Sequence, residues 1–179
     1  LPDDDRFLGK GTITVSQMDV HGPSQCAVPD QAMLYCDRRL TWGETDKIAI
    51  SQVEDALKDA GVDDFTVYMP EYSKPAWTGT EYHQELYFPT WKIPENHILV
   101  QSGIDAYTAL FGEKPVVDKW TFSTNAVAIC GRHNIPVIGF GPGDEDQAHA
   151  PNEVTRVDDL EIASAFYVAL PFALSILGA

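Results

Sequence analysis

The sequence is poor in basic residues and in cysteine. Against 27 Asp and Glu residues it has only 12 Lys and Arg, which gives a formal net charge of -15. Such a chain repels polyanions, so a nucleic-acid partner and an anionic membrane surface are both disfavoured. The three cysteines form an odd set without metal-finger spacing, which fits buried thiols in a reduced compartment and predicts the cytoplasm. They are Cys26, Cys36 and Cys130.

A signal peptide, a long apolar span and an internal repeat are also missing from these residues. The apolar tail from 163 to 177 is short and interrupted by Pro171, so we predict a cytoplasmic protein without a membrane partner. What is present is 44% hydrophobic residues in a chain of 179, enough for one domain or two small ones. The opening Leu-Pro-Asp-Asp-Asp indicates either a piece of a longer chain or a processed amino terminus.

Hydrophobic periodicity predicts a β-β-α-β series in the first half of the chain. Two alternating segments have the period of half-buried strands, an apolar repeat has helical spacing, and a β-branched run is a third strand. These segments are residues 11–16, 27–40, 49–60 and 65–69. Gly61 is expected to end the helix, and Arg38 and Arg39 to point to opposite faces. The series predicts an antiparallel sheet covered by helices on one face.

The second half predicts a different arrangement. Beyond a linking segment rich in proline and aromatic residues, strands and helices alternate, which implies parallel strands with crossovers. The expected elements are a helix from Asn96 to Gly112, a strand at 116–122, a helix at 125–131, a strand at 135–140 and a final helix with a capping box of Asp158 and Glu161. The fold class is therefore α/β: an α+β portion over 1–84, then part of a domain with a mostly parallel sheet over 85–179.

The loop from Gly139 to Glu153 is the main candidate site. Three glycines and a proline stop the preceding strand, so an acidic loop leaves the end of the sheet, where α/β folds keep their sites. Ala148 and Pro151 are expected to hold the backbone of His149 extended, which suits a ligand. On spacing alone, an ordinary surface histidine is the more frequent case.

Read whole, this loop resembles the closing motif of a known enzyme family. Gly-Phe-Gly-Pro-Gly-Asp followed by Ala-His-Ala-Pro-Asn-Glu is similar to the dizinc aminoacylase and carboxypeptidase family, which includes acetylornithine deacetylase, succinyl-diaminopimelate desuccinylase and peptidase T. The segment Lys119–Asn125 resembles its branch of selenium-metabolism hydrolases. The likeness covers nearly all of the chain but only the second half of such a protein. It implies that His149 is the last ligand of a two-zinc site, which could also take other divalent metals. Glu153 is a candidate to support the His149 side chain without contacting the metal itself.

The resemblance also implies substrate contacts. Asp37-Arg38-Arg39 matches a motif whose arginine grips the carboxylate of the substrate, and the planar fork of Arg39 suits that task. The alternative is a weak surface ion pair. The asparagine of a further family motif is replaced here by Cys26, which puts the usual carboxylate contact in question.

A turn before the predicted helix at 125–131 aligns with the family's contact to the substrate backbone. A plain helix N-cap is an equally good interpretation, and both roles are compatible. The residues of this turn are Ser123, Thr124 and Asn125.

The family's other metal ligands and its general base match nothing in these residues, so we expect no catalytic residue in this chain and no activity of the chain alone. The remaining histidines fit no ligand motif, and no Ser or Cys triad is evident. The first hypothesis is the C-terminal part of a zinc-dependent hydrolase that cleaves an amide or peptide-like C–N bond in a small, carboxylate-bearing, amino-acid-derived or peptide substrate. The alternative is a dimerisation or substrate-binding module that forms a homodimer through residues 1–84, which resemble part of the family's lid domain.

Overall fold

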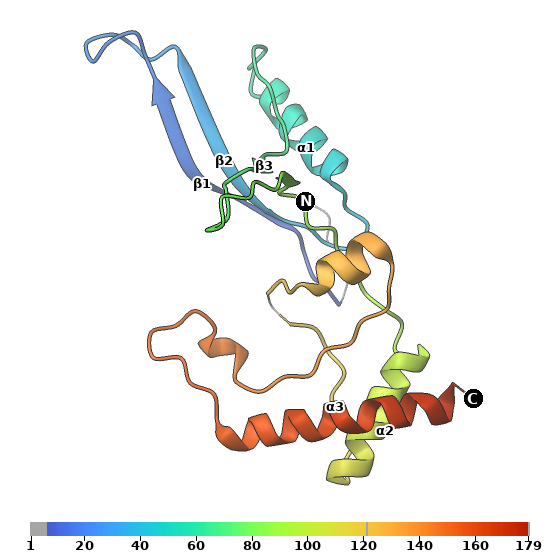
Figure 1. The fold of residues 1–179 in the computed structure, drawn as a ribbon. Helices are drawn as coiled ribbons and strands as arrows, with labels where there is room; N and C mark the ends of the chain where they lie inside the picture. Colours follow the sequence, from blue (N-terminus) through green and yellow to red (C-terminus); the bar gives the residue numbers. More distant parts are fainter. Residues whose placement is uncertain (1–6, 121, 179) are drawn as a thin grey trace. The chain divides into compact units, whose positions relative to one another are not determined.

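The structure is a computed structural model that describes residues 7–120 and 122–178, so the opening turn lies outside the described residues. The chain forms two compact units, Leu1–Thr90 and Trp91–Ala179, which are described separately. Helices and strands are both present, and the α/β class is confirmed (Figure 1).

A long antiparallel hairpin dominates the first unit. It pairs β1 (Thr12–His21) with β2 (Gln31–Arg39), and the break predicted after residue 21 is the turn between them. Val15 faces Cys36 and Gln17 faces Tyr35, so Ser16 is the extra residue of a β-bulge. The bulge has a clear consequence, because it changes which residues of β1 share a face.

The bulge keeps the apolar residues of β1 together although their spacing in the sequence slips by one. Opposite residues share a face and β2 alternates regularly, so the register defines one apolar face. That face holds Ile13, Val15, Met18, Val20, Ala32, Leu34 and Cys36. The predicted division of β2 into two faces is thereby confirmed, including the opposite directions of Arg38 and Arg39.

Helix α1 (Asp46–Asp59) follows the hairpin. Thr45 caps its start by accepting a hydrogen bond from the N–H of Ile48 at 3.3 Å. Its end is a Schellman turn: Gly61 has a φ of 76°, and the N–H of Val62 donates to the carbonyl of Leu57 at 3.0 Å. The prediction that Gly61 ends this helix is confirmed, because a left-handed residue is needed there.

The prediction of a third strand at residues 65–69 was wrong. Those residues form no ladder, and the next pairing is the two-residue bridge of β3 (Glu71–Tyr72) with β4 (Gln84–Glu85). β-branched and aromatic residues favour a strand only where a sheet edge offers hydrogen bonds. In the described part of the chain, the hairpin and this bridge are separate two-stranded sheets.

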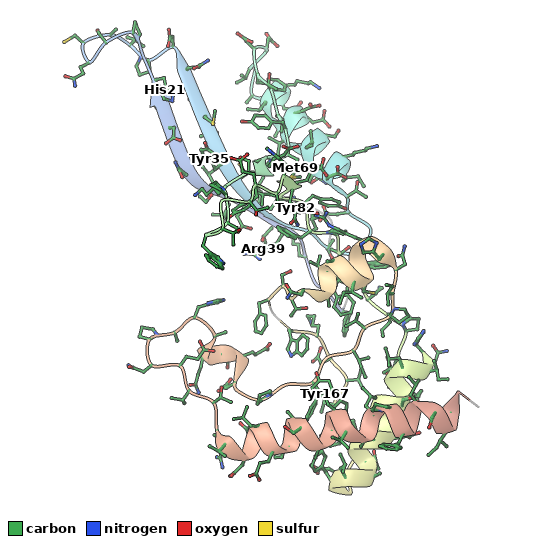
Figure 2. The ribbon with its side chains drawn as sticks, viewed as in Figure 1. His21, Tyr35, Arg39, Met69, Tyr82 and Tyr167 are labelled. Carbon is green, nitrogen blue, oxygen red and sulfur yellow. The ribbon has the colours of Figure 1, made fainter. Side chains whose placement is uncertain are left out.

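Two crossing helices form the core of the second unit, α2 (Ile98–Phe111) and α3 (Val157–Leu177) (Figure 1). Gly103 of α2 leaves room for the side chain of Ile138, since a Cβ there would lie 2.9 Å from the Cδ1 of Ile138. Apolar residues are buried on both helices: Val100, Ile104, Ala106, Ala163 and Phe166. Tyr167 of α3, labelled in Figure 2, donates a 2.5 Å hydrogen bond to the carbonyl of Phe140 and so ties the following loop to the helix.

The ends of these helices differ from the prediction in two places. His97, not Asn96, caps α2, because its Nδ1 accepts a hydrogen bond from the N–H of Leu99 at 3.2 Å. The expected capping box of α3 is absent, since its N-cap is Arg156, whose guanidinium pairs with Asp158 at 3.1 Å. Gly112 ends α2 as predicted, with a φ of 76°.

Pro171 does not interrupt the last helix, which was a further error. α3 continues through it for 21 residues and is long and apolar enough, by length and composition alone, to cross a membrane. One such helix is weak evidence for a membrane span, since core helices and signal sequences pass the same test. Of its apolar window 11% is buried, and Ala163 and Phe166 are the buried residues of α3.

The parallel strands predicted for this unit are not formed among the described residues. Segments 116–120, 122 and 135–140 make no ladder, and residue 121 lies outside the described residues. The helix expected between them is present as a π-helix at Val127–Arg132. Parallel strands need neighbours and cover on both faces, whereas Val116 is 89% exposed and Ile135 is 55% exposed.

Candidate functional site

A half-open pocket lies in the second unit at the glycine-rich loop. Its volume is about 210 Å³, and its walls come from the segment around Trp120 to Thr124 and from the loop after Phe140. Its aromatic, hydroxyl and carboxylate lining residues include Trp120, Phe122, Thr124, Asp144, Glu145 and Glu153. Three of these are carboxylates and none of the lining residues is basic, so the pocket favours cations.

The backbone of His149 is left-handed, with a φ of 65°, which corrects the expectation that its neighbours hold it extended. The preceding 3₁₀ turn, Glu145–Gln147, is capped by Asp144 and feeds the chain into this conformation. Asn152 is left-handed too, with a φ of 64°. Asn and His are among the residues that tolerate this region best, so the loop uses two of them to turn sharply.

Glu153 holds that turn. Its Oε2 accepts a hydrogen bond from the backbone N–H of His149 at 3.1 Å, while the carboxylate also lines the pocket. The contact is therefore to the backbone of His149, and the imidazole itself is exposed at the loop surface next to the pocket residue Ala148. The support of the His149 imidazole by Glu153 and the metal-ligand role of His149 therefore both stay predictions.

The N-cap of the π-helix, expected among Ser123, Thr124 and Asn125, is instead Ala126, which has no side-chain cap bond. The Oγ1 of Thr124 accepts a hydrogen bond from the N–H of Ala126 at 3.2 Å, and Thr124 also lines the pocket. Ser123 and Asn125 flank it without lining the pocket. Only Thr124 of the three is thus placed to contact a ligand in the pocket, and that contact is a prediction.

The sequence reasoning missed the aromatic wall of the pocket. Trp120 and Phe122 lie stacked, with ring centroids 6.4 Å apart and an interplanar angle of 1°. Gly139 faces the Trp120 ring so closely that a Cβ there would overlap it. The alternation Trp-x-Phe in a strand-like run was the available signal, because residues two apart point to the same side.

Arg39 lies in the first unit, at the end of β2 remote from the turn near His21 (Figure 2). Its side chain is 67% exposed and forms a bidentate pair with Asp37, at 2.9 Å from Nε to Oδ1 and 3.1 Å from Nη2 to Oδ2. The surface ion pair named as the alternative is therefore present. Such an exposed pair is worth little in stability, so the guanidinium is accessible to a competing carboxylate.

The described residues hold no group of three or more His, Cys, Asp and Glu side chains that is arranged for a metal ion. Cys26 and Cys36 are exposed, so the expected burial of the thiols was wrong for both. The N–H of Cys26, in the hairpin turn, donates to the Oγ of Ser24 at 3.3 Å. Cys130 is buried in the π-helix, and burial raises the pKa of its thiol above 9.0, partly opposed by a backbone hydrogen bond with Val137. A thiol with a raised pKa is protonated at neutral pH and is a poor nucleophile.

Comparison with known proteins identifies the family. Residues 9–172 match Peptidase family M20/M25/M40. The chain belongs to this family. The structure is also similar to the crystal structure of an M20 family metallo-carboxypeptidase, Sso-CP2 from Sulfolobus solfataricus, with a TM-score of 0.53, 21% identity and coverage of 95% of this chain and 36% of that one. At that identity the likeness concerns the fold.

Two curated proteins that are similar to this chain are both called uncharacterized protein YgeY, one from Escherichia coli strain K12 and one from Escherichia coli O157:H7. Each is 53% identical over 169 residues, which is 94% of this chain. The M20 chain spans only 42% of the length of these relatives. Its residues therefore correspond to part of the longer M20 proteins.

Proposed function

We propose that this M20 chain is the substrate-gripping and metal-completing part of a hydrolase that cleaves an amide or peptide-like C–N bond in a small carboxylate-bearing substrate. The observation that carries the proposal is the turn at His149, which Glu153 fixes beside the acidic pocket. It lies inside the stretch matched to the peptidase family. M20 membership supports a metallopeptidase type of chemistry.

The described residues fit a divalent metal by donor type but not by number. An imidazole and carboxylates are ligands that zinc accepts, yet a catalytic zinc needs about three protein ligands. Since the described residues provide no such group, we propose that further ligands come from a longer protein. When bound, zinc or another divalent ion would supply Lewis-acid polarisation of the substrate carbonyl.

The roles proposed for this chain's own residues are binding and orientation. Arg39 would pair with the substrate carboxylate through its planar fork, which fixes direction as well as distance. Thr124 would contact the substrate at the pocket wall formed by Trp120 and Phe122. Glu153 would keep the His149 turn in place, and no residue described here is assigned a proton-transfer step.

The exposed area supports the idea that further protein covers this chain. Its accessible surface is 13338 Å², whereas a compact monomer of 19.8 kDa exposes about 8,600 Å² and two separate halves together about 10,400 Å². The excess over the second figure is about 2,900 Å² on this chain alone, more than the roughly 800 Å² per partner that a standard interface buries. We also propose, from the sequence alone, a cytoplasmic location and membership of the selenium-metabolism branch of the family.

Metal content and hydrolysis test the proposal together. The chain alone is expected to bind zinc weakly and to hydrolyse no acylated amino acid or dipeptide. In the longer protein, His149→Ala should remove one metal and nearly all activity, whereas the control His133→Ala, on another exposed histidine, should retain both. Tight stoichiometric zinc in the chain alone, or full activity of the His149→Ala variant, would refute it.

A second candidate function, dimerisation, is favoured by the hairpin. Its apolar face is exposed, with Met18 at 61% and Val15 at 53%, and within the described chain each strand pairs on one edge only. Such a face and such edges are common contact surfaces. Analytical ultracentrifugation of the metal-free chain should show a homodimer if this function is correct, and a monomer at high concentration if it is not.

A further inference from the structure

We infer that Glu44, acting through Arg38, is a positioning residue for Arg39. The inference rests on the proposed function, because it concerns how the arginine expected to grip the substrate carboxylate is held. The two neighbouring arginines differ in burial: the side chain of Arg38 is 11% exposed and that of Arg39 is 67% exposed. One fastens the end of β2, and the other is presented to a ligand.

Arg38 fastens the backbone of its own neighbour. Its Nη1 donates to the carbonyl oxygen of Arg39 at 2.5 Å and to the carbonyl oxygen of Thr12 at 3.1 Å. Thr12 is the residue paired with Arg39 across the hairpin. The guanidinium therefore bridges both strands at the very position from which the Arg39 side chain leaves, and it limits rotation of that residue.

Glu44 holds the guanidinium in this place. Its side chain is 3% exposed, and its Oε1 accepts from the Nη2 of Arg38, which also donates to the Oε1 of Gln52 at 3.1 Å. A buried charge with one partner removed is costly, so both ions are retained only as a pair. The second oxygen, Oε2, accepts from the N–H of Thr41 at 2.8 Å and closes the turn after β2.

The surrounding chain is shaped to this pair. Thr41 is 1% exposed and its hydroxyl donates to the carbonyl of Gly9. Gly11 lies directly beneath the ions, since a Cβ at that residue would lie 2.7 Å from both the Nη1 of Arg38 and the Oε2 of Glu44. The clamp therefore consists of Arg38, Glu44, Gln52 and Thr41, and it occupies space that only a glycine leaves open.

The clamp determines what Arg39 presents on the other face. Residues two apart in a strand share a face, so Asp37 pairs with the Nε and Nη2 of Arg39. The Nη1 of Arg39 makes no hydrogen bond to the described residues, so that edge of the fork is open to a ligand. A fork held in one orientation binds a carboxylate better than one that must first be ordered.

The experiment measures carboxylate binding to the chain itself, without hydrolysis. N-acetylglycine is titrated while the side-chain Nε–H signals of Arg38 and Arg39 are followed by NMR. Glu44→Gln should weaken binding about tenfold, in line with the cost of misplacing a binding group. Gln52→Ala, which removes one bond of the clamp, should weaken it less. The control Glu54→Gln makes the same charge change as Glu44→Gln, but at a residue of α1 outside the clamp.

Separate variants distinguish the inference from the function it rests on. If Arg39→Ala binds the probe as well as the unaltered chain, the proposed role of Arg39 fails. If Arg39→Ala loses binding while Glu44→Gln and Gln52→Ala both retain it, the positioning inference fails and the proposed function stands. A Glu44→Gln chain that does not fold leaves Gln52→Ala to decide, because a merely structural clamp would lower stability without changing the affinity of the folded chain.

Discussion

The contact between Gly139 and Trp120 predicts a large effect of a single methyl group. In Gly139→Ala, the new Cβ would overlap the ring, so either the backbone or the ring has to move. Adding a methyl group to a packed site costs about 1–3 kcal/mol. If the ring swings out instead, it gives up the covered part of a side chain that is 41% exposed.

That second route sets an upper limit. Roughly 150 Å² of ring surface would return to water, which at about 25 cal/mol per Å² is near 4 kcal/mol. The rearrangement with the smaller free-energy cost prevails, so we expect the free energy of unfolding of the second unit to fall by about 1–3 kcal/mol. Trp120 also stacks on Phe122 in the pocket wall, so tryptophan fluorescence should change in the folded state.

The assay is urea unfolding, followed by fluorescence and by circular dichroism. Gly141→Ala is the matched control, since it lies in the same loop and a Cβ there meets nothing within 4 Å. Its stability should stay within about 0.5 kcal/mol of the unaltered chain. Equal unfolding curves for the two variants would refute the packing of Gly139 on Trp120.

Three further predictions concern local features. Gly61→Ala should lower stability by about 1 kcal/mol in urea unfolding, because the residue is left-handed with a φ of 76°, and an unchanged midpoint would contradict the Schellman turn. Glu153→Ala should speed hydrogen exchange of the His149 N–H about threefold to tenfold, since that N–H loses its carboxylate acceptor, and an unchanged rate would contradict the contact. The pKa of Cys130 is raised in the folded state, so its contribution is complete below pH 9.0 and is lost as the pH rises from 9.0 through the folded pKa. The stability difference between the unaltered chain and Cys130→Ala should therefore shrink between pH 8 and pH 10, and a constant difference would contradict the raised pKa.

The sequence by itself determined features whose causes lie within a few residues. Gly61 and Gly112 end helices because the left-handed conformation at a helix end is local. The family was readable as well, because the residues around His149 and Pro151 form a contiguous motif.

Only the tertiary structure decided features that depend on where sheet edges and side chains lie in the folded chain. Segments 65–69 and 135–140 have strand-like composition but no ladder, since pairing needs a partner edge that composition does not specify. The backbone of His149 is left-handed because the carboxylate of Glu153 and the turn before it fold back on it. Its neighbours in the sequence indicated the opposite.

The pair of arginines shows the same limit. Alternation along β2 correctly placed Arg38 and Arg39 on opposite faces, yet it gave no sign of which one would be buried. That choice depends on Glu44 and on the space above Gly11, both brought to Arg38 by the turn after β2 and the pairing of the strands. A buried charge is stable only where a partner is already held in place, and the position of that partner is a property of the folded chain.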